Sequence, residues 1–226
     1  MSDTALSIIS GKPLAEEEGL GTLTMSGWLR EVTEKFGPRE ALVMHGGDTA
    51  TRWTYDDLWA RANEVARALI ACGTGKGTRV GVLMTNRPEF LSAAFGASLA
   101  GCVATPSSTL STPDEMEYLL DISGVSVLLL ERKVLKKDFS DMIVGIDAEI
   151  GKAEPGKLAS PKYPFLRHVA AIGGGDGMIE DWDDFLARGK DVDQAMVDAA
   201  AATVTPADQG AIFFSSGSTA KPMAGL

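Results

Sequence analysis

Hydroxyl-bearing residues gather around a single glycine close to the end of the sequence. This run contains Ser215, Ser216, Gly217, Ser218, Thr219 and Lys221, and it directly follows the apolar residues 211–214. Glycine lets a backbone approach a ligand closely, and successive N–H groups can form a concave anion-binding site. Hydroxyl groups and a lysine ammonium add donors for phosphate oxygens. A Ser-rich surface loop or linker has the same composition, but the strand-like run before it favours a phosphate-binding loop.

Three other stretches could carry chemistry but favour simpler interpretations. Residues 72–78 (CGTGKGT) lack the spacing of a Walker loop and lie between a predicted helix and a predicted strand, so they predict a turn. Residues 173–177 (GGGDG) lack the dinucleotide-binding spacing, and we predict a surface loop. The carboxylates at Asp181, Asp183 and Asp184 alternate with aromatic residues, which favours the polar face of an amphipathic turn over a metal site.

Zinc and hydrolase chemistry have little support in the sequence. The two histidines, His45 and His168, and the two cysteines, Cys72 and Cys102, do not cluster at metal-ligand spacings. We expect both cysteines to be reduced, buried thiols. The Gly-x-Ser-x-Gly pattern of the hydrolase nucleophile elbow is absent from the sequence.

The segment 54–130 alternates between helix and strand patterns. Three apolar runs of strand length, 79–84, 102–105 and 125–130, predict strands buried on both faces. A helix is expected before each run, with start signals at Thr54, Pro88 and Thr112. The helix over 90–100 is apolar on every side, so we expect it to be buried. This alternation implies right-handed crossovers and a mostly parallel sheet flanked by helices, which is an α/β fold.

The remaining elements are less regular. A helix over 23–36 and a hairpin of 41–44 with 49–53 are expected before the alternating segment. After it, we expect helices over 139–150, 182–187 and 192–202. We expect strands over 166–172 and 211–214. We predict a poorly ordered leader over residues 1–22 and an α/β subdomain over 23–204. A strand with the phosphate-binding loop is predicted over 205–226.

Length and composition exclude several classes of protein. The 226 residues are 45% hydrophobic and 23% charged, as in ordinary globular proteins. A chain of this length buries roughly 70% of its unfolded surface and needs no disulfide framework. The net charge of −10 disfavours a nucleic-acid partner. The start lacks the basic region of a signal peptide, and no apolar run reaches ~18 residues, so we expect a cytoplasmic protein without a membrane span.

Four elements together resemble the AMP-forming acyl- and aryl-CoA synthetases, a family that includes luciferases and non-ribosomal adenylation domains. The run 213–222 (FFSSGSTAKP) resembles the phosphate-binding signature of that family. Residues 53–58 (WTYDDL), 79–90 (RVGVLMTNRPEF) and 100–106 (AGCVATP) resemble three earlier elements in the same order and spacing. The resemblance covers about residues 24–222 and implies the first part of the large N-terminal domain of an adenylate-forming ligase.

This resemblance implies a two-step reaction. A carboxylic acid attacks the α-phosphate of ATP, which gives an acyl-adenylate and pyrophosphate, and a thiol, usually that of coenzyme A, then takes the acyl group. Magnesium accompanies the ATP, and we expect a fatty or other hydrophobic acid. The residues implied to hold the β- and γ-phosphates are Ser215, Ser216, Gly217, Ser218, Thr219 and Lys221. The chain departs from the family at Ala220, Met223 and Ala224, where Gly, Lys and Gly are usual.

The family's adenine platform, ribose-binding Asp, acyl pocket and lid lysine all lie beyond the phosphate-binding loop. We therefore expect this truncated chain to be an inactive fragment of an acid–CoA ligase. Two alternatives stay open: a non-catalytic α/β module for binding or assembly with a degenerate loop, and a fragment of a carrier-loading adenylation domain. A homodimer is compatible with the sequence.

Overall fold

A five-stranded parallel sheet forms the centre of the protein. The computed structural model describes residues 10, 11, 13, 16, 21–47, 49–215 and 223–225. The strand order is β4-β3-β5-β8-β9. In that order the strands span Val103–Pro106, Arg79–Leu83, Val127–Glu131, His168–Ile172 and Ile179–Asp181. Every pairing among them is parallel, which confirms the α/β fold class.

The continuous apolar strands separate two hydrophobic cores. Val127 and Leu129 face one core, while Leu128 and Leu130 face the other. Successive side chains of a strand point to opposite faces, so a strand buried on both faces is apolar at every position. This explains why the runs 79–84 and 125–130 showed no alternation of polar and apolar residues.

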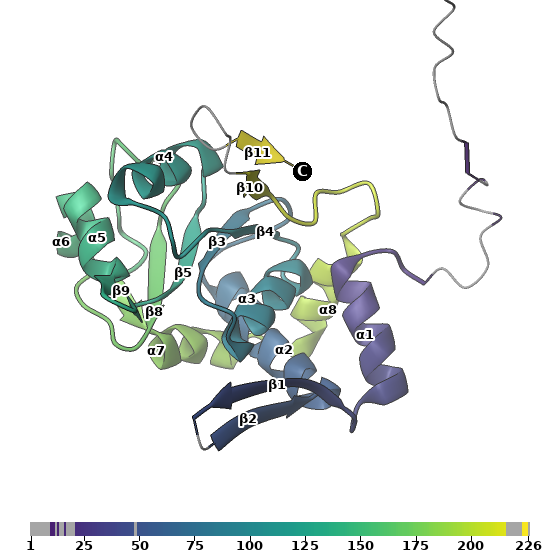
Figure 1. Cartoon of the computed structure of the whole chain (residues 1–226). Coiled ribbons are helices and arrows are strands. Elements are labelled where there is room, and N and C mark those ends of the chain that lie inside the picture. The colour runs from purple at the N-terminus through teal and green to yellow at the C-terminus, as the bar shows by residue number, and fades with distance from the viewer. Residues whose placement is uncertain are drawn as a thin grey trace, which may run out of the picture.

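Helices cover both faces of the sheet (Figure 1). On one face lie α1 (Met25–Phe36), α2 (Tyr55–Ala71), α3 (Pro88–Leu99), α7 (Trp182–Ala187), the 3₁₀ helix η2 (Arg188–Asp191) and α8 (Gln194–Ala202). The other face carries α4, α5 and α6, which span Pro113–Ser123, Phe139–Ile146 and Ala148–Lys152. The predicted starts at Thr54 and Thr112 are confirmed as capping boxes, because each hydroxyl accepts a backbone N–H while the carboxylate three residues on accepts the cap's own N–H.

Among the described residues, three small antiparallel pairs of strands lie outside the main sheet. The predicted hairpin is confirmed as β1 (Glu40–Gly46) with β2 (Thr49–Thr54), at the bottom of Figure 1. The second pair is β6 (Lys133–Val134) with β7 (Lys137–Asp138), and the third is β10 (Phe213–Ser215) with β11 (Met223–Gly225). Of these strands, β6, β7 and β11 were not predicted from the sequence. No helix among the described residues is long and apolar enough to cross a bilayer.

Three expectations need correction. The helix predicted over 139–150 is broken at Asp147, whose backbone is extended (φ −147°) and whose carboxylate instead caps α6 by accepting the Glu149 N–H. The strand predicted from residue 166 begins at His168. The helix expected to be wholly buried, α3, leaves Phe90, Leu91 and Phe95 partly exposed.

Candidate phosphate-binding site

A turn at residues 205–208 begins the approach to the predicted loop. The Asp208 carboxylate accepts the N–H and the hydroxyl of Thr205, at 2.7 and 2.9 Å. The ammonium of Lys76 lies 2.8 Å from the same carboxylate and also donates to the Thr203 carbonyl at 2.7 Å. The Lys76 hydrogen bond, followed by those from Thr205, lowers the pKa of Asp208 to about 2. The segment is thus fastened to the turn over 72–78, which the structure confirms as a helix-to-strand turn.

The chain then joins the edge of the sheet beside β4. Ala211 forms a parallel bridge with Ala104, and the Ile212 N–H donates to the Ala104 carbonyl at 2.9 Å. The strand predicted over 211–214 is therefore present as this bridge and β10. The last residue of β10, Ser215, is paired with Met223 of β11.

The loop itself connects β10 to β11. Its other predicted phosphate-binding residues lie outside the described part of the chain, namely Ser216, Gly217, Ser218, Thr219 and Lys221. The structure describes how the chain enters and leaves this loop. Because the segment before it runs parallel to β4, the loop begins at the edge of the sheet where the parallel strands have their carboxyl ends. Open α/β sheets bind ligands at this edge.

The loop that follows β4, residues 107–112, starts at the same edge and is rich in hydroxyl groups. Its conformation is fixed by Lys137 of β7, whose ammonium donates to the carbonyls of Thr109, Leu110 and Ser111 at 3.2, 2.8 and 2.8 Å. Three carbonyl oxygens suit the three N–H donors of one ammonium. This contact could not be predicted from the sequence, since Lys137 lies far from the loop along the chain.

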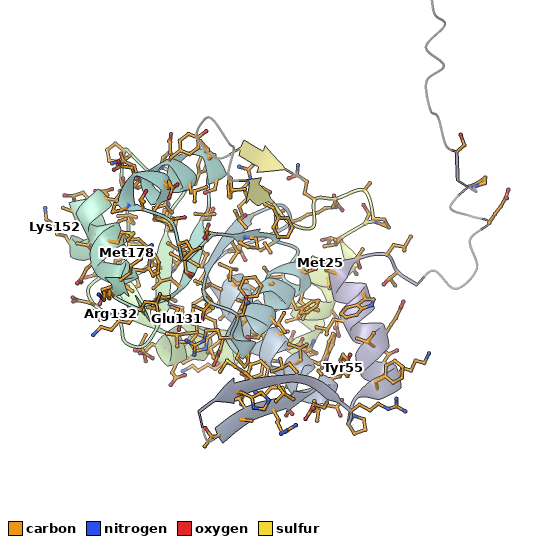
Figure 2. All side chains as sticks on the ribbon, viewed as in Figure 1. Met25, Tyr55, Glu131, Arg132, Lys152 and Met178 are labelled. Atoms are coloured by element: carbon orange, nitrogen blue, oxygen red, sulfur yellow. The ribbon has the colours of Figure 1, made fainter. Side chains whose placement is uncertain are left out.

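A polar network joins the carboxyl ends of β3 and β5. Glu131, the last residue of β5, accepts the N–H and hydroxyl of Thr85 at 3.0 and 2.7 Å and pairs with Arg87 at 3.1 Å. Arg87 also pairs with Glu89 at 2.7 Å. Burial is the largest single influence and raises the pKa of Glu89. The hydrogen bond and charge of Arg87, a backbone hydrogen bond and the charge of Arg61 together outweigh it, so the pKa lies below its usual value. Figure 2 labels Glu131 and the neighbouring Arg132 on the side of the molecule that carries α5 and α6.

This network lies at the point where the strand order reverses, because β3 leads to β4 on one side and β5 leads to β8 on the other. Ligand sites of open α/β sheets favour this position. Thr85, Arg87 and Glu131 were not predicted as a group from the sequence, since only the strand order places them together. Their location at or just beyond the carboxyl ends of two buried strands is the signal by which they could have been predicted.

One described cavity adjoins the turn at residues 205–208. It has a volume of about 380 Å³ and is lined by Lys76, Gly77, Gly101, Cys102 and Asp208, among others. Gly77 and Cys102 precede β3 and β4, so this cavity is at the amino ends of the strands. We therefore place the candidate site at the opposite edge, with the loop.

The other candidate residues have structural surroundings. Asp181 caps α7 by accepting the Asp183 N–H at 3.0 Å. Both cysteines are free thiols; Cys102 is buried as predicted, whereas Cys72 is only partly buried. Desolvation raises the pKa of the Cys72 thiol to about 12 and that of Cys102 to about 11, so neither is a thiolate at neutral pH. His168 lies 3.5 Å from Glu180, which also binds Arg188. In the part of the chain that the structure describes, no three or more His, Cys, Asp or Glu side chains form a group that could hold a metal.

Comparison with known proteins agrees with this architecture. The family model described as AMP-binding enzyme matches residues 29–223. YngI of Bacillus subtilis (strain 168), which carries the name of an acyl-CoA synthetase, is 29% identical over 174 residues, covering 76% of this chain and 31% of YngI. The long-chain-fatty-acid–CoA ligase FadD13 of Mycobacterium tuberculosis (strain H37Rv) is 27% identical over 197 residues, covering 87% of this chain and 33% of FadD13.

Solved structures show the same fold. The crystal structure of the anthranilate CoA ligase AuaEII in complex with anthranoyl-AMP matches with a TM-score of 0.65 at 22% identity, covering 91% of this chain and 34% of AuaEII. The chain spans about a third of the length of these relatives.

Proposed function

Because this chain belongs to the AMP-binding enzyme family, we propose that it is the amino-terminal part of an ATP-dependent acid–CoA ligase. The observation that carries the proposal is the path of residues 210–215, which run along β4 and deliver Ser215 to the carboxyl edge of the sheet. A loop that is rich in hydroxyl groups and contains a lysine, at that edge, suits a polyphosphate.

The proposed role of the loop is to stabilise the negative charge of the phosphates during the first step. In the proposed reaction an oxygen of a carboxylic acid attacks the α-phosphorus of ATP, the bond to the β-phosphate breaks, and pyrophosphate leaves. The thiol sulfur of coenzyme A then attacks the acyl carbon, and AMP leaves. Hydroxyl groups of Ser215, Ser216, Ser218 and Thr219, backbone N–H groups near Gly217 and the ammonium of Lys221 hold the β- and γ-phosphates. Fixed donors placed where charge develops lower the barrier to the first step.

Magnesium accompanies the nucleotide in this proposal and screens phosphate charge. The described residues include no group of carboxylates that could hold the ion alone, so we assign it no protein ligand. We propose a hydrophobic acid as the substrate, supported by the similarity to FadD13, and the cytoplasm as the location.

Binding of inorganic tripolyphosphate to this chain, measured by isothermal titration calorimetry, tests the loop without requiring an adenine site. We expect binding that Lys221→Ala weakens about tenfold, because one charge-assisted contact is lost. Lys190→Ala removes an exposed lysine of η2 and is the control. Equal binding by wild type and Lys221→Ala would remove the loop from the proposal.

We predict that this chain alone releases no pyrophosphate from ATP with a panel of fatty acids. Turnover above the blank contradicts that prediction. The reading frame beyond codon 226 decides between ligase and module: an adenine-binding motif and a lid lysine downstream support the ligase. A stop codon directly after Leu226 favours a non-catalytic α/β module.

A further inference from the structure

Leu135 combines a left-handed backbone conformation with an apolar side chain that is almost fully exposed to solvent. Val134 pairs with Lys137, so Leu135 and Lys136 form a two-residue turn between β6 and β7. Leu135 has φ +55°, a conformation in which a hairpin turn usually carries glycine, and its side chain is 96% exposed. Neither packing nor backbone preference explains a leucine here. A strained residue with an exposed apolar side chain is a reason to look for a function.

Two lysines flank this leucine. Lys133 and Lys136 are exposed and have no ion pair in the part of the chain that the structure describes. The other two cations of the hairpin are occupied: Arg132 pairs with Asp138 at 3.1 Å and lies 4.0 Å from Asp141, and Lys137 is bound by the carbonyls of 109–111. The free charge at the tip of the hairpin is therefore positive, although the whole chain carries −10.

A second exposed leucine is fixed beside the hairpin. Leu110 is 79% exposed, and its carbonyl accepts a hydrogen bond from Lys137 at 2.8 Å. The contact holds the loop over 107–112 against β7. Leu110, Lys133, Leu135 and Lys136 form what we call the tip patch.

We propose that the tip patch docks the protein on an anionic lipid surface. Apolar side chains enter the boundary between headgroups and acyl chains, while lysines contact anionic headgroups. The patch is a projecting turn with one leucine at its end, a shape that suits insertion between lipids. A protein partner would need about 800 Å² of complementary surface. Docking here turns the carboxyl edge of the sheet toward the bilayer, because the hairpin directly follows β5.

Flotation of the full chain with lipid vesicles tests this proposal. At low salt we expect the protein to float with equimolar phosphatidylcholine and phosphatidylglycerol, but not with phosphatidylcholine alone. Added sodium chloride should weaken the binding by screening. Leu135→Gly should lower the partition coefficient about tenfold, because the inserted side chain is lost. Lys136→Glu should lower it at least about fivefold, and Leu135→Phe should retain it.

Three controls separate docking from folding. Leu135→Gly should raise the urea midpoint of unfolding, because glycine relieves the positive φ. Leu23 has the same kind of backbone (φ +54°) and is 43% exposed, so Leu23→Gly should leave vesicle binding unchanged. Lys190→Glu makes the same charge change as Lys136→Glu at an exposed lysine outside the tip patch. It should alter vesicle binding only through the change in net charge.

The proposal is overturned if the wild-type chain does not float with anionic vesicles, or floats equally with neutral ones. It is also overturned if Leu135→Gly binds like the wild type. Retention of the chain by an acidic protein column without vesicle binding would assign the patch to a protein partner instead.

Discussion

Asp208 shows how one carboxylate can hold the approach to a loop. Its pKa of about 2 lies below the ordinary 3.8, through Lys76 and Thr205. A depressed pKa means that its stabilising contribution is present above about pH 4 and is lost as the pH falls toward 2.

Asp208→Asn should therefore lower the melting temperature at pH 7, and the difference from wild type should shrink as the pH falls from about 4 to about 2. Thermal unfolding followed by circular dichroism at several pH values measures this. Asp121→Asn removes an exposed carboxylate of α4 and should show no such pH-dependent difference. A constant difference for Asp208→Asn down to pH 2 would contradict the assignment.

Individual contacts were predictable only where they are local. The caps at Thr54 and Thr112 follow from a spacing of three residues, and the sequence predicted both. The contacts of Lys76 with Asp208 and of Lys137 with residues 109–111 join segments far apart along the chain. No periodicity or motif encodes these contacts, so only the fold could reveal them.

At the scale of elements, α2 and α3 pack closely through a glycine. A Cβ atom on Gly96 would lie 2.7 Å from the Val65 side chain and 2.8 Å from the Ala62 carbonyl oxygen. Gly96→Ala should therefore destabilise the protein by about 1–3 kcal/mol, although alanine favours helix. Urea unfolding measures the change. Gly145→Ala on α5, where a Cβ meets nothing within 4 Å, should stabilise or be neutral.

Lys137 links β7 to the loop over 107–112. Lys137→Met keeps the aliphatic stem and removes the donor, so the carbonyls of 109–111 lose their partner. We expect a loss of about 1–2 kcal/mol in unfolding free energy and faster amide hydrogen exchange within 107–112. Lys136→Met changes the adjacent, exposed lysine and should leave both unchanged. Equal exchange in the two variants would show that the contact does not hold the loop.

The elements themselves were largely predictable, for a physical reason. Strands buried on both faces and helices with start signals leave strong local patterns, and all three strands of 79–130 were found. The two-residue strands β6 and β7 are too short to leave a pattern of alternating polar and apolar residues. The break at Asp147 was missed because residues on both sides of it favour helix.

At the scale of the whole molecule, strand order decides where the chemistry belongs. The sequence predicted a parallel α/β sheet but not the order β4-β3-β5-β8-β9. That order brings Thr85, Arg87 and Glu131 together, and it leaves the free side of β4 for residues 210–212. The resemblance located the candidate loop within the sequence, whereas the pairing of Ala211 with Ala104 shows that the chain enters this loop at the carboxyl edge.

The pairing of Ala211 with Ala104 also orders events during synthesis. A ribosome makes the chain from its amino end, and domains begin to fold as they emerge. All five strands of the main sheet precede residue 210, so the sheet can form before the loop leaves the exit tunnel. The free edge of β4 then stays without its partner segment, residues 210–212, while α5 to α8 are synthesised. Premature pairing of that edge with another nascent chain is the hazard that this arrangement creates, and a chaperone that shields β4 would raise the yield of folded protein.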